Sequence, residues 1–196
     1  MTSINYDRET ALVVVDVQND FADPNGSLYV AGGEDVVPVI NTEIAAARSA
    51  GARVIYTADW HPATTPHFAK DGGIWPVHCV ADTWGAEFHP NLIVDGPVVR
   101  KGTGGEDGYS GFAVRDPETG DVAATGLADQ LERWGVKTLV VAGLATDYCV
   151  KETAVDGVAG GYRVLLLQEA IRPVDLQPGD GDRALVTMAE AGCLLT

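Results

Sequence analysis

The chain has 196 residues, of which 46% are hydrophobic and 21% charged, proportions that are typical of a single folded domain over residues 1–196. The formal net charge of −15 disfavours binding to nucleic acid or to an anionic membrane surface. No apolar run is long enough to span a bilayer, and residues 1–7 lack the basic and apolar segments of a signal peptide. We therefore expect a cytoplasmic protein whose three cysteines are free thiols.

Short apolar runs alternate with helical patterns along the chain. In chain order, these patterns predict a strand at 11–15, a helix at 36–50, strands at 53–58 and 94–100, a helix at 127–134, a strand at 138–142, a helix at 147–159, a strand at 163–167, a helix at 182–191 and a last strand at 193–195. Strands that are apolar throughout are buried on both faces. The alternation therefore predicts an α/β fold, a three-layer α/β/α sandwich around a mostly parallel six-stranded sheet.

Chemically active residues follow several of the predicted strands. Asp16, Asp59 and Lys101 each lie at the carboxyl end of a strand, and Cys149 lies shortly after the strand at 138–142. Ligands of open α/β sheets bind beyond the carboxyl ends of the strands, so we expect these four side chains to share one crevice. Residues 61–91 and 102–121 lack periodicity, and loops of that length are typical of functional segments that cover such a crevice.

Cys149 is the candidate nucleophile. It lies near the start of the helix predicted at 147–159, where the helix dipole and free backbone amides are expected to stabilise a thiolate. A nearby Lys101 would stabilise it further, and Asp16 would accept the thiol proton or orient Lys101. The amides of Cys149 and of the turn before it would face an oxyanion. Taken alone, each residue also fits an inert structural role, but their convergence favours a cysteine hydrolase.

A candidate metal site follows directly after Asp59. Three of the four histidines, His61, His67 and His78, lie within eighteen residues. Imidazole nitrogens with one carboxylate suit one divalent ion, either Zn²⁺, Fe²⁺ or Mn²⁺. A loop histidine bonded to the backbone is the usual alternative for a single residue, whereas this density favours ligation. His89 is interpreted as structural.

Three aromatic residues, Phe21, Trp75 and Tyr109, lie in the segments expected to cover the crevice. Flat aromatic side chains can enclose a planar ring between them, which favours a ring-bearing substrate. Ordinary packing of loop residues fits the same pattern equally well.

Six short motifs occur in order over nearly the whole chain: DVQNDF at 16–21, DWHP at 59–62 with HF at 67–68, WPVHC at 75–79, KG at 101–102, YSGF at 109–112 and GLATDYCV at 143–150. Together they resemble the nicotinamidase (pyrazinamidase) branch of the isochorismatase-like cysteine hydrolases. Two features depart from that pattern. The glycine-rich segment 102–108 is slightly long, and Tyr148 stands where relatives often have His.

The resemblance implies a catalytic triad of Asp16, Lys101 and Cys149. It also implies a non-proline cis peptide between Leu144 and Ala145, and an oxyanion hole formed by the amides of Ala145 and Cys149. A metal would be bound by Asp59, His61 and His78, with His67 at a position that varies within the family. The implied reaction converts nicotinamide to nicotinate and ammonia through a Cys149 thioester, with pyrazinamide as a further substrate.

Three other functions compete with this interpretation. An isochorismatase would cleave a vinyl ether, but that branch lacks the histidine-rich motif. A related amidase or ureide hydrolase would act on a non-aromatic amide, and a silent binding domain would lack Asp16, Lys101 or Cys149. We expect a small-molecule carboxamide as the partner, with no nucleic acid and no membrane, in a monomer or a homo-oligomer.

Overall fold

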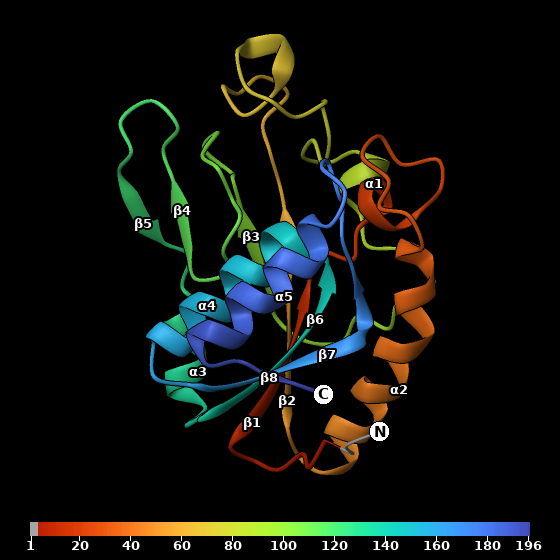
Figure 1. The fold of residues 1–196 in the computed structure, drawn as a ribbon, viewed down its shortest axis with the longest axis vertical. Coiled ribbons are helices and arrows are strands. Elements are labelled where there is room, and N and C mark those ends of the chain that lie inside the picture. Colours follow the sequence, from red (N-terminus) through yellow and green to blue (C-terminus); the bar gives the residue numbers. More distant parts are fainter. Residues whose placement is uncertain (1–3) are drawn as a thin grey trace.

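A six-stranded sheet with helices on both faces forms the centre of the computed structural model, which describes residues 4–196 (Figure 1). Its strands are β1 (Thr10–Val15), β2 (Arg53–Asp59), β3 (Val98–Lys101), β6 (Thr138–Leu144), β7 (Arg163–Arg172) and β8 (Leu194–Leu195). The α-helices are α1 (Asn19–Ala22), α2 (Val36–Ser49), α3 (Leu127–Arg133), α4 (Lys151–Ala159) and α5 (Asp180–Ala191). Residues 1–3, which belong to the segment considered above for a signal peptide, lie outside the described part of the chain.

All neighbouring strands of the sheet pair in parallel, in the order β3-β2-β1-β6-β7-β8. The chain starts in the middle with β1, adds β2 and β3 on one side, and then returns to add β6, β7 and β8 on the other. The direction in which strands are added therefore reverses between β1 and β6, and the helices that follow these two strands, α2 and α4, pack on opposite faces of the sheet. Open α/β sheets bind their ligands at such a point.

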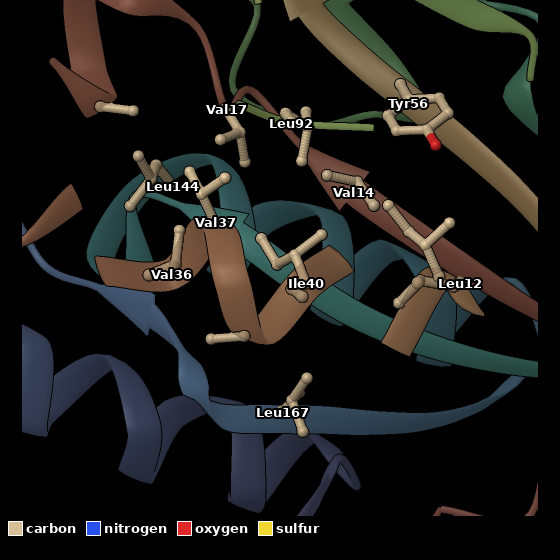
Figure 2. Packing of buried hydrophobic residues seen from close by; sticks show 14 of the residues in the cluster. Leu12, Val14, Val17, Val36, Val37, Ile40, Tyr56, Leu92, Leu144 and Leu167 are labelled. Atoms are coloured by element: carbon tan, nitrogen blue, oxygen red, sulfur yellow. The ribbon is translucent and has the colours of Figure 1, made fainter. Parts of the chain in front are cut away.

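Strand β1 is fully buried because both of its faces are covered. Leu12 and Val14 pack against α2 in one apolar cluster, part of which Figure 2 shows. Ala11, Val13 and Val15 pack on the opposite face against residues of α3, α4 and α5. These two clusters confirm the predicted three-layer sandwich and hold the central strands rigidly. Over residues 4–196, none of the helices combines the length and the apolarity that crossing a membrane requires.

Several element bounds differ from the sequence prediction. The third strand begins at Val98 rather than at 94, because Gly96 and Pro97 interrupt the apolar run. The helix predicted at 147–159 begins as a π-helical turn, η4 (Thr146–Val150), which contains Cys149. An exposed antiparallel hairpin of β4 (Ala113–Arg115) and β5 (Val122–Ala124) was not predicted, because its short strands bury no apolar face. Single 3-10 turns occur at η1 (Gly33–Asp35), η2 (Ala69–Asp71) and η3 (Trp84–Ala86).

Candidate active site

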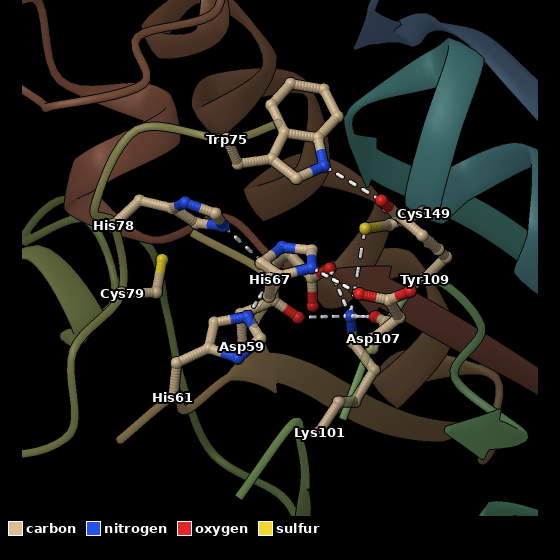
Figure 3. Close-up of polar contacts among 12 residues, drawn as sticks. Asp59, His61, His67, Trp75, His78, Cys79, Lys101, Asp107, Tyr109 and Cys149 are labelled. Atoms are coloured by element: carbon tan, nitrogen blue, oxygen red, sulfur yellow. Dashed lines mark hydrogen bonds and ion pairs between the residues drawn. The ribbon is translucent and has the colours of Figure 1, made fainter. Parts of the chain in front are cut away.

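The three residues predicted to form a nucleophile site come together at the carboxyl edge of the sheet. The Nζ atom of Lys101, at the end of β3, donates a hydrogen bond to Oδ2 of Asp16 at 2.8 Å. The same Nζ lies 3.8 Å from Sγ of Cys149 (Figure 3). Asp16 follows β1 directly, and Thr57 of β2 donates to its other carboxylate oxygen at 2.6 Å. The adjacent strands therefore fix the orientation of Asp16 toward Lys101.

Burial governs the protonation of this site. Burial raises the pKa of Asp16 above its ordinary value, and the Lys101 ammonium offsets this only in part. Burial by itself would lower the pKa of Lys101, but Asp16 and Asp59 outweigh it and hold that pKa well above its usual value. The site therefore contains a permanently charged lysine and a carboxyl group that can hold a proton.

The helix terminus and Lys101 were expected to stabilise a thiolate on Cys149, but the surroundings of the sulfur favour its protonated form. Burial raises the pKa of Cys149 well above its usual value, Lys101 opposes this, and Asp16 and Asp59 add to it. The physical reason is that two carboxylates already balance the charge of Lys101, so little of it remains for the sulfur. The raised pKa favours the thiol form of Cys149, from which Asp16 was expected to accept a proton.

Asp59 connects the nucleophile site to the histidine cluster. Its Oδ1 accepts a hydrogen bond from Lys101 Nζ at 2.6 Å, while its Oδ2 lies 3.7 Å from Nε2 of His61 and 3.9 Å from Nε2 of His78. Burial opposes the charge on Asp59, but Lys101 and the two histidines outweigh it and hold the pKa of Asp59 below its usual range. Asp59 is therefore an anion shared by both halves of the site.

The predicted ligands surround one small space. The ligand atoms of His61, His67 and His78 all lie within 4.8 Å of one another (Figure 3). The separations between Asp59 and the histidines exceed hydrogen-bond length. Bonds from Zn²⁺ to nitrogen or oxygen are about 2.0–2.2 Å long, so atoms at these separations can share one ion. The arrangement thus fits a divalent cation.

The state of the individual histidines supports this fit. His61 is fully buried, yet neither of its ring nitrogens has a hydrogen-bond partner. An unsatisfied buried polar group costs about 1–3 kcal/mol, and a bound cation would remove part of that cost. Burial lowers the pKa of His78 to about 4, and its Nδ1 is bonded to the Pro76 carbonyl at 2.7 Å. His78 is therefore neutral at physiological pH, as metal ligation requires.

Polar residues of the first motif hold the metal-site loops in place. The Gln18 side chain donates to the Asp59 carbonyl at 2.7 Å and accepts from the Asp59 N–H at 2.8 Å. Asp20 accepts a hydrogen bond from the backbone N–H of Cys79 at 2.7 Å, next to His78. These contacts span 41 and 59 residues of sequence, so the motif positions the metal site without contributing a ligand.

Gly102 is required where the third strand passes the metal site. Its φ of 70° lies in the left-handed region, and a Cβ atom there would meet the His61 ring at 2.4 Å. Only glycine allows the backbone to pass this close to the imidazole. The dipeptide Lys101-Gly102 thus joins the buried ammonium to a turn that packs against His61.

The three predicted aromatic residues line one pocket together with Cys149. The pocket holds about 390 Å³ of empty space, counting its open mouth, and Phe21, Trp75 and Tyr109 form part of its wall. The Trp75 Nε1 donates a hydrogen bond to the Tyr109 hydroxyl at 2.8 Å and so joins the two long loops (Figure 3). The ring of Tyr148 lies edge-on to Trp75, with centroids 4.8 Å apart.

Other wall residues were not identified from the sequence. Leu28 and Val174 also line the pocket, and isolated apolar residues in loops give no signal of such a role. Asp147 accepts hydrogen bonds from the N–H groups of Val174 and Asp175, both at 2.9 Å. The segment that carries Val174 is thereby fixed to the turn that carries Cys149.

The backbone before Cys149 has the predicted form. The peptide between Leu144 and Ala145 is cis, and Ala145 lines the pocket beside Cys149. The two residues predicted to supply oxyanion amides thus border the same space as the sulfur atom.

Known proteins resemble this chain in sequence and in fold. The profile of the Isochorismatase domain matches residues 10–196. The nicotinamidase of Escherichia coli is 37% identical in an alignment 203 residues long, which covers 94% of this chain and 93% of that protein. Two solved structures are similar over nearly their whole length. The pyrazinamidase of Pyrococcus horikoshii in complex with zinc has a TM-score of 0.85 and 39% identity, covering 96% of this chain and 98% of that chain.

The second structure, PnC1 from L. infantum in complex with nicotinate, has a TM-score of 0.87 and 34% identity, covering 98% of this chain and 95% of that chain. The resemblance inferred from the six motifs is thereby confirmed, as is the fold expected from the strand and helix pattern. The profile match and the full-length relatives show that this chain belongs to the isochorismatase-domain family, in the branch that contains the nicotinamidases.

Proposed function

We propose that this protein hydrolyses nicotinamide to nicotinate and ammonia through a thioester on Cys149, and that it accepts pyrazinamide as well. The observation that carries the proposal is the position of Cys149 Sγ, which borders an aromatic-walled pocket and lies 3.8 Å from the Lys101 ammonium. Its relatives include a nicotinamidase and a protein solved with nicotinate. The rings of Phe21, Trp75 and Tyr148 suit a planar heteroaromatic ring better than a linear amide.

In the first step, the Cys149 sulfur attacks the carboxamide carbon and the thiol proton passes to Asp16. The carboxylate oxygen of Asp16 and the sulfur lie within 4.8 Å of each other, and the raised pKa of Asp16 makes its carboxylate a better proton acceptor than an exposed one. The carbonyl oxygen becomes an oxyanion, which the backbone amides of Ala145 and Cys149 stabilise. Lys101 keeps its charge throughout and compensates the charge that moves between sulfur and carboxylate.

In the second step, the C–N bond breaks and Asp16 returns its proton to the nitrogen, which leaves as ammonia. Water then attacks the thioester while Asp16 accepts one of its protons. The C–S bond breaks, the sulfur recovers its proton from Asp16, and the product leaves as nicotinic acid, which loses its proton to the solvent to give nicotinate. Each proton that Asp16 accepts is returned within the same half-reaction, so the enzyme ends in its starting state.

Asp59, His61, His67 and His78 would hold one divalent ion, either Zn²⁺, Fe²⁺ or Mn²⁺. A bound cation there would supply a Lewis acid that orients an electron-rich ring atom of the substrate. The fully buried, unpartnered ring of His61 is the observation that supports this site.

The decisive experiment measures ammonia release from nicotinamide by the purified protein, before and after chelation, beside two cysteine variants. Cys149→Ala should lower turnover by about 10⁴-fold or more, because the covalent route is lost. Cys193→Ala removes the same atoms from a buried cysteine outside the pocket and should remain active. Substantial turnover by a folded Cys149→Ala protein would overturn the thioester mechanism.

The substrate is tested in the same assay. Nicotinamide and pyrazinamide should release ammonia, and a linear ureide should not. If the metal-loaded protein released ammonia from the ureide alone, the site would belong to a hydrolase of non-aromatic amides. Reconstitution of the chelated protein with Zn²⁺, Fe²⁺ or Mn²⁺ in turn identifies the ion that restores activity.

A further inference from the structure

His67 is held differently from the other two histidines of the cluster. Its Nδ1 lies 2.5 Å from Oδ1 of Asp107, and its side chain is almost completely buried. The Nδ1 of His78 is bonded instead to a backbone carbonyl, and within residues 4–196 neither ring nitrogen of His61 has a hydrogen-bond partner. Of the three histidines, His67 is therefore the one whose ring nitrogen lies within hydrogen-bond distance of a carboxylate in residues 4–196 (Figure 3).

The backbone around Asp107 is fixed independently of its side chain. The Asp107 N–H donates to the Arg115 carbonyl at 2.7 Å, and the Arg115 N–H donates back to the Asp107 carbonyl at 3.0 Å. Arg115 belongs to β4, so the hairpin of β4 and β5 supports the glycine-rich segment at this point. A substitution of the Asp107 side chain leaves both backbone hydrogen bonds in place.

We propose that Asp107 is the positioning residue of the metal site: its carboxylate accepts the proton on Nδ1 of His67 and thereby directs Nε2 of His67 toward the space shared with His61 and His78. A carboxylate partner fixes the imidazole tautomer and increases the basicity of the nitrogen that binds the metal. The chain thus recruits His67 as a fourth protein ligand, beside Asp59, His61 and His78, through a residue 40 positions away.

This inference rests on the metal site of the proposed function, and its test does not depend on turnover. The test compares Zn²⁺ affinity, measured by competition with a chelator, in the wild-type protein and in Asp107→Ala and Asp107→Asn. Loss of a carboxylate partner lowers metal affinity by about 10- to 100-fold in comparable sites, and we expect that loss in Asp107→Ala. Asp107→Asn keeps an acceptor oxygen and should recover part of the affinity.

Glu106→Ala is the matched control. Glu106 precedes Asp107 in the same segment and carries the same charge, but within residues 4–196 its carboxylate accepts a hydrogen bond from the Gly104 N–H alone, at 2.8 Å. Its removal should leave the Zn²⁺ affinity near that of the wild type. Equal losses in Glu106→Ala and Asp107→Ala would show that Asp107 acts only through its charge, which would overturn the proposal.

The route through His67 is tested by a double-mutant cycle. His67→Ala should weaken Zn²⁺ binding, and adding Asp107→Ala to it should cost nothing more, because the partner is already absent. Nitrogen chemical shifts of the imidazole should report an Nδ1–H tautomer of His67 in the metal-free wild-type protein. That tautomer should be lost in Asp107→Ala.

Several results would overturn the inference: unchanged affinity in Asp107→Ala, a full additional loss in the double variant, or no stoichiometric Zn²⁺ binding by the wild-type protein. Metal binding with the expected loss in Asp107→Ala, but without ammonia release from any amide, would instead contradict the proposed function and leave the role of Asp107 intact.

Discussion

Lys101 and Asp59 form the link between the two halves of the site, because the ammonium that lies 3.8 Å from the Cys149 sulfur also donates at 2.6 Å to the carboxylate facing the histidines. Lys101 is fully buried and has carboxylates on two sides. A change in charge at the histidine cluster should therefore alter the pKa of Cys149, because Asp59 and Lys101 lie between the two. Metal binding and nucleophile protonation should be coupled for this reason.

Lys101→Met should destabilise the protein by about 3–5 kcal/mol, since it leaves two buried carboxylates without their common counter-ion. Urea unfolding measures the loss, and turnover should fall to background in the same variant. Lys137→Met provides the control, because Lys137 pairs with Glu9 on the surface at 3.2 Å and should contribute less than about 1 kcal/mol. Equal stabilities for the two variants would contradict a structural role for the buried ion cluster.

Alkylation of Cys149 should be slow at neutral pH. Because burial raises the pKa of Cys149 well above its usual value, the reactive thiolate is scarce at pH 7 and becomes more abundant as the pH rises. The rate of iodoacetamide labelling, followed on the Cys149 peptide by mass spectrometry, should still be increasing at about pH 9. A plateau below pH 7 would instead indicate a resting thiolate.

The metal-free protein should lose stability as the pH falls from about 6.5 toward 4. Burial lowers the pKa of His78 to about 4, so between these values the unfolded chain binds a proton at His78 that the folded chain does not. The contribution of His78 to the free energy of unfolding is complete above the pKa of His78 in the unfolded chain. Below that pKa it is lost at up to about 1.4 kcal/mol per pH unit. Urea unfolding of the chelated protein at several pH values should show a flatter dependence in His78→Gln.

Trp75 and Tyr109 should act on substrate binding as a pair. Trp75→Phe and Tyr109→Phe each remove the 2.8 Å hydrogen bond between the two loops while keeping an aromatic ring. A hydrogen bond of this kind contributes about 0.5–1.5 kcal/mol. If its loss is expressed in the free energy of substrate binding, the KM for nicotinamide should rise roughly 2- to 10-fold. The KM of the double variant should be no higher than that of the single variant with the higher KM. Fully additive losses of binding free energy would show that the two residues act separately.

Gly143→Ala should be far more costly than an ordinary glycine substitution. Gly143 has a φ of 120°, and a Cβ atom there would lie 2.0 Å from the Val15 carbonyl oxygen in the neighbouring strand. Gly72 has a comparable φ of 109°, but no atom lies within 4 Å of such a Cβ. Gly72→Ala therefore measures the cost of the backbone conformation alone. We expect Gly143→Ala to unfold at lower urea concentration, with an excess cost of about 1–3 kcal/mol or more.

The sequence predicted the sheet and the placement of Asp16, Asp59, Lys101 and Cys149, because strand ends follow from continuous apolar runs and parallel strands share an edge. It could not show that Asp59 serves both halves of the site, since that depends on which carboxylate oxygen faces which neighbour. The raised pKa of Cys149 could not be predicted for a similar reason: the helix terminus is visible in the sequence, whereas the burial and the two carboxylates that outweigh it are not.

Asp107 gave no sequence signal either. It lies in a glycine-rich segment without periodicity, and its partner His67 is 40 residues away. The hairpin that supports it has three-residue strands with mostly exposed side chains, so no apolar alternation marked it. Contacts of this kind depend on how the loops cross the edge of the sheet. The apolar periodicity of a single sequence locates helices and strands, but it does not predict how loops cross.

The order of strands in the sheet has a consequence for how the protein acquires its activity. Asp16 follows the first strand in the chain and Cys149 follows β6, yet β1 and β6 are direct neighbours in the sheet. The whole interval between them, and β6 itself, must be synthesised before these strands can pair. Parallel pairing over such distances raises the contact order and slows folding. A growing chain therefore cannot bring Asp16 and Cys149 together until β6 has paired with β1.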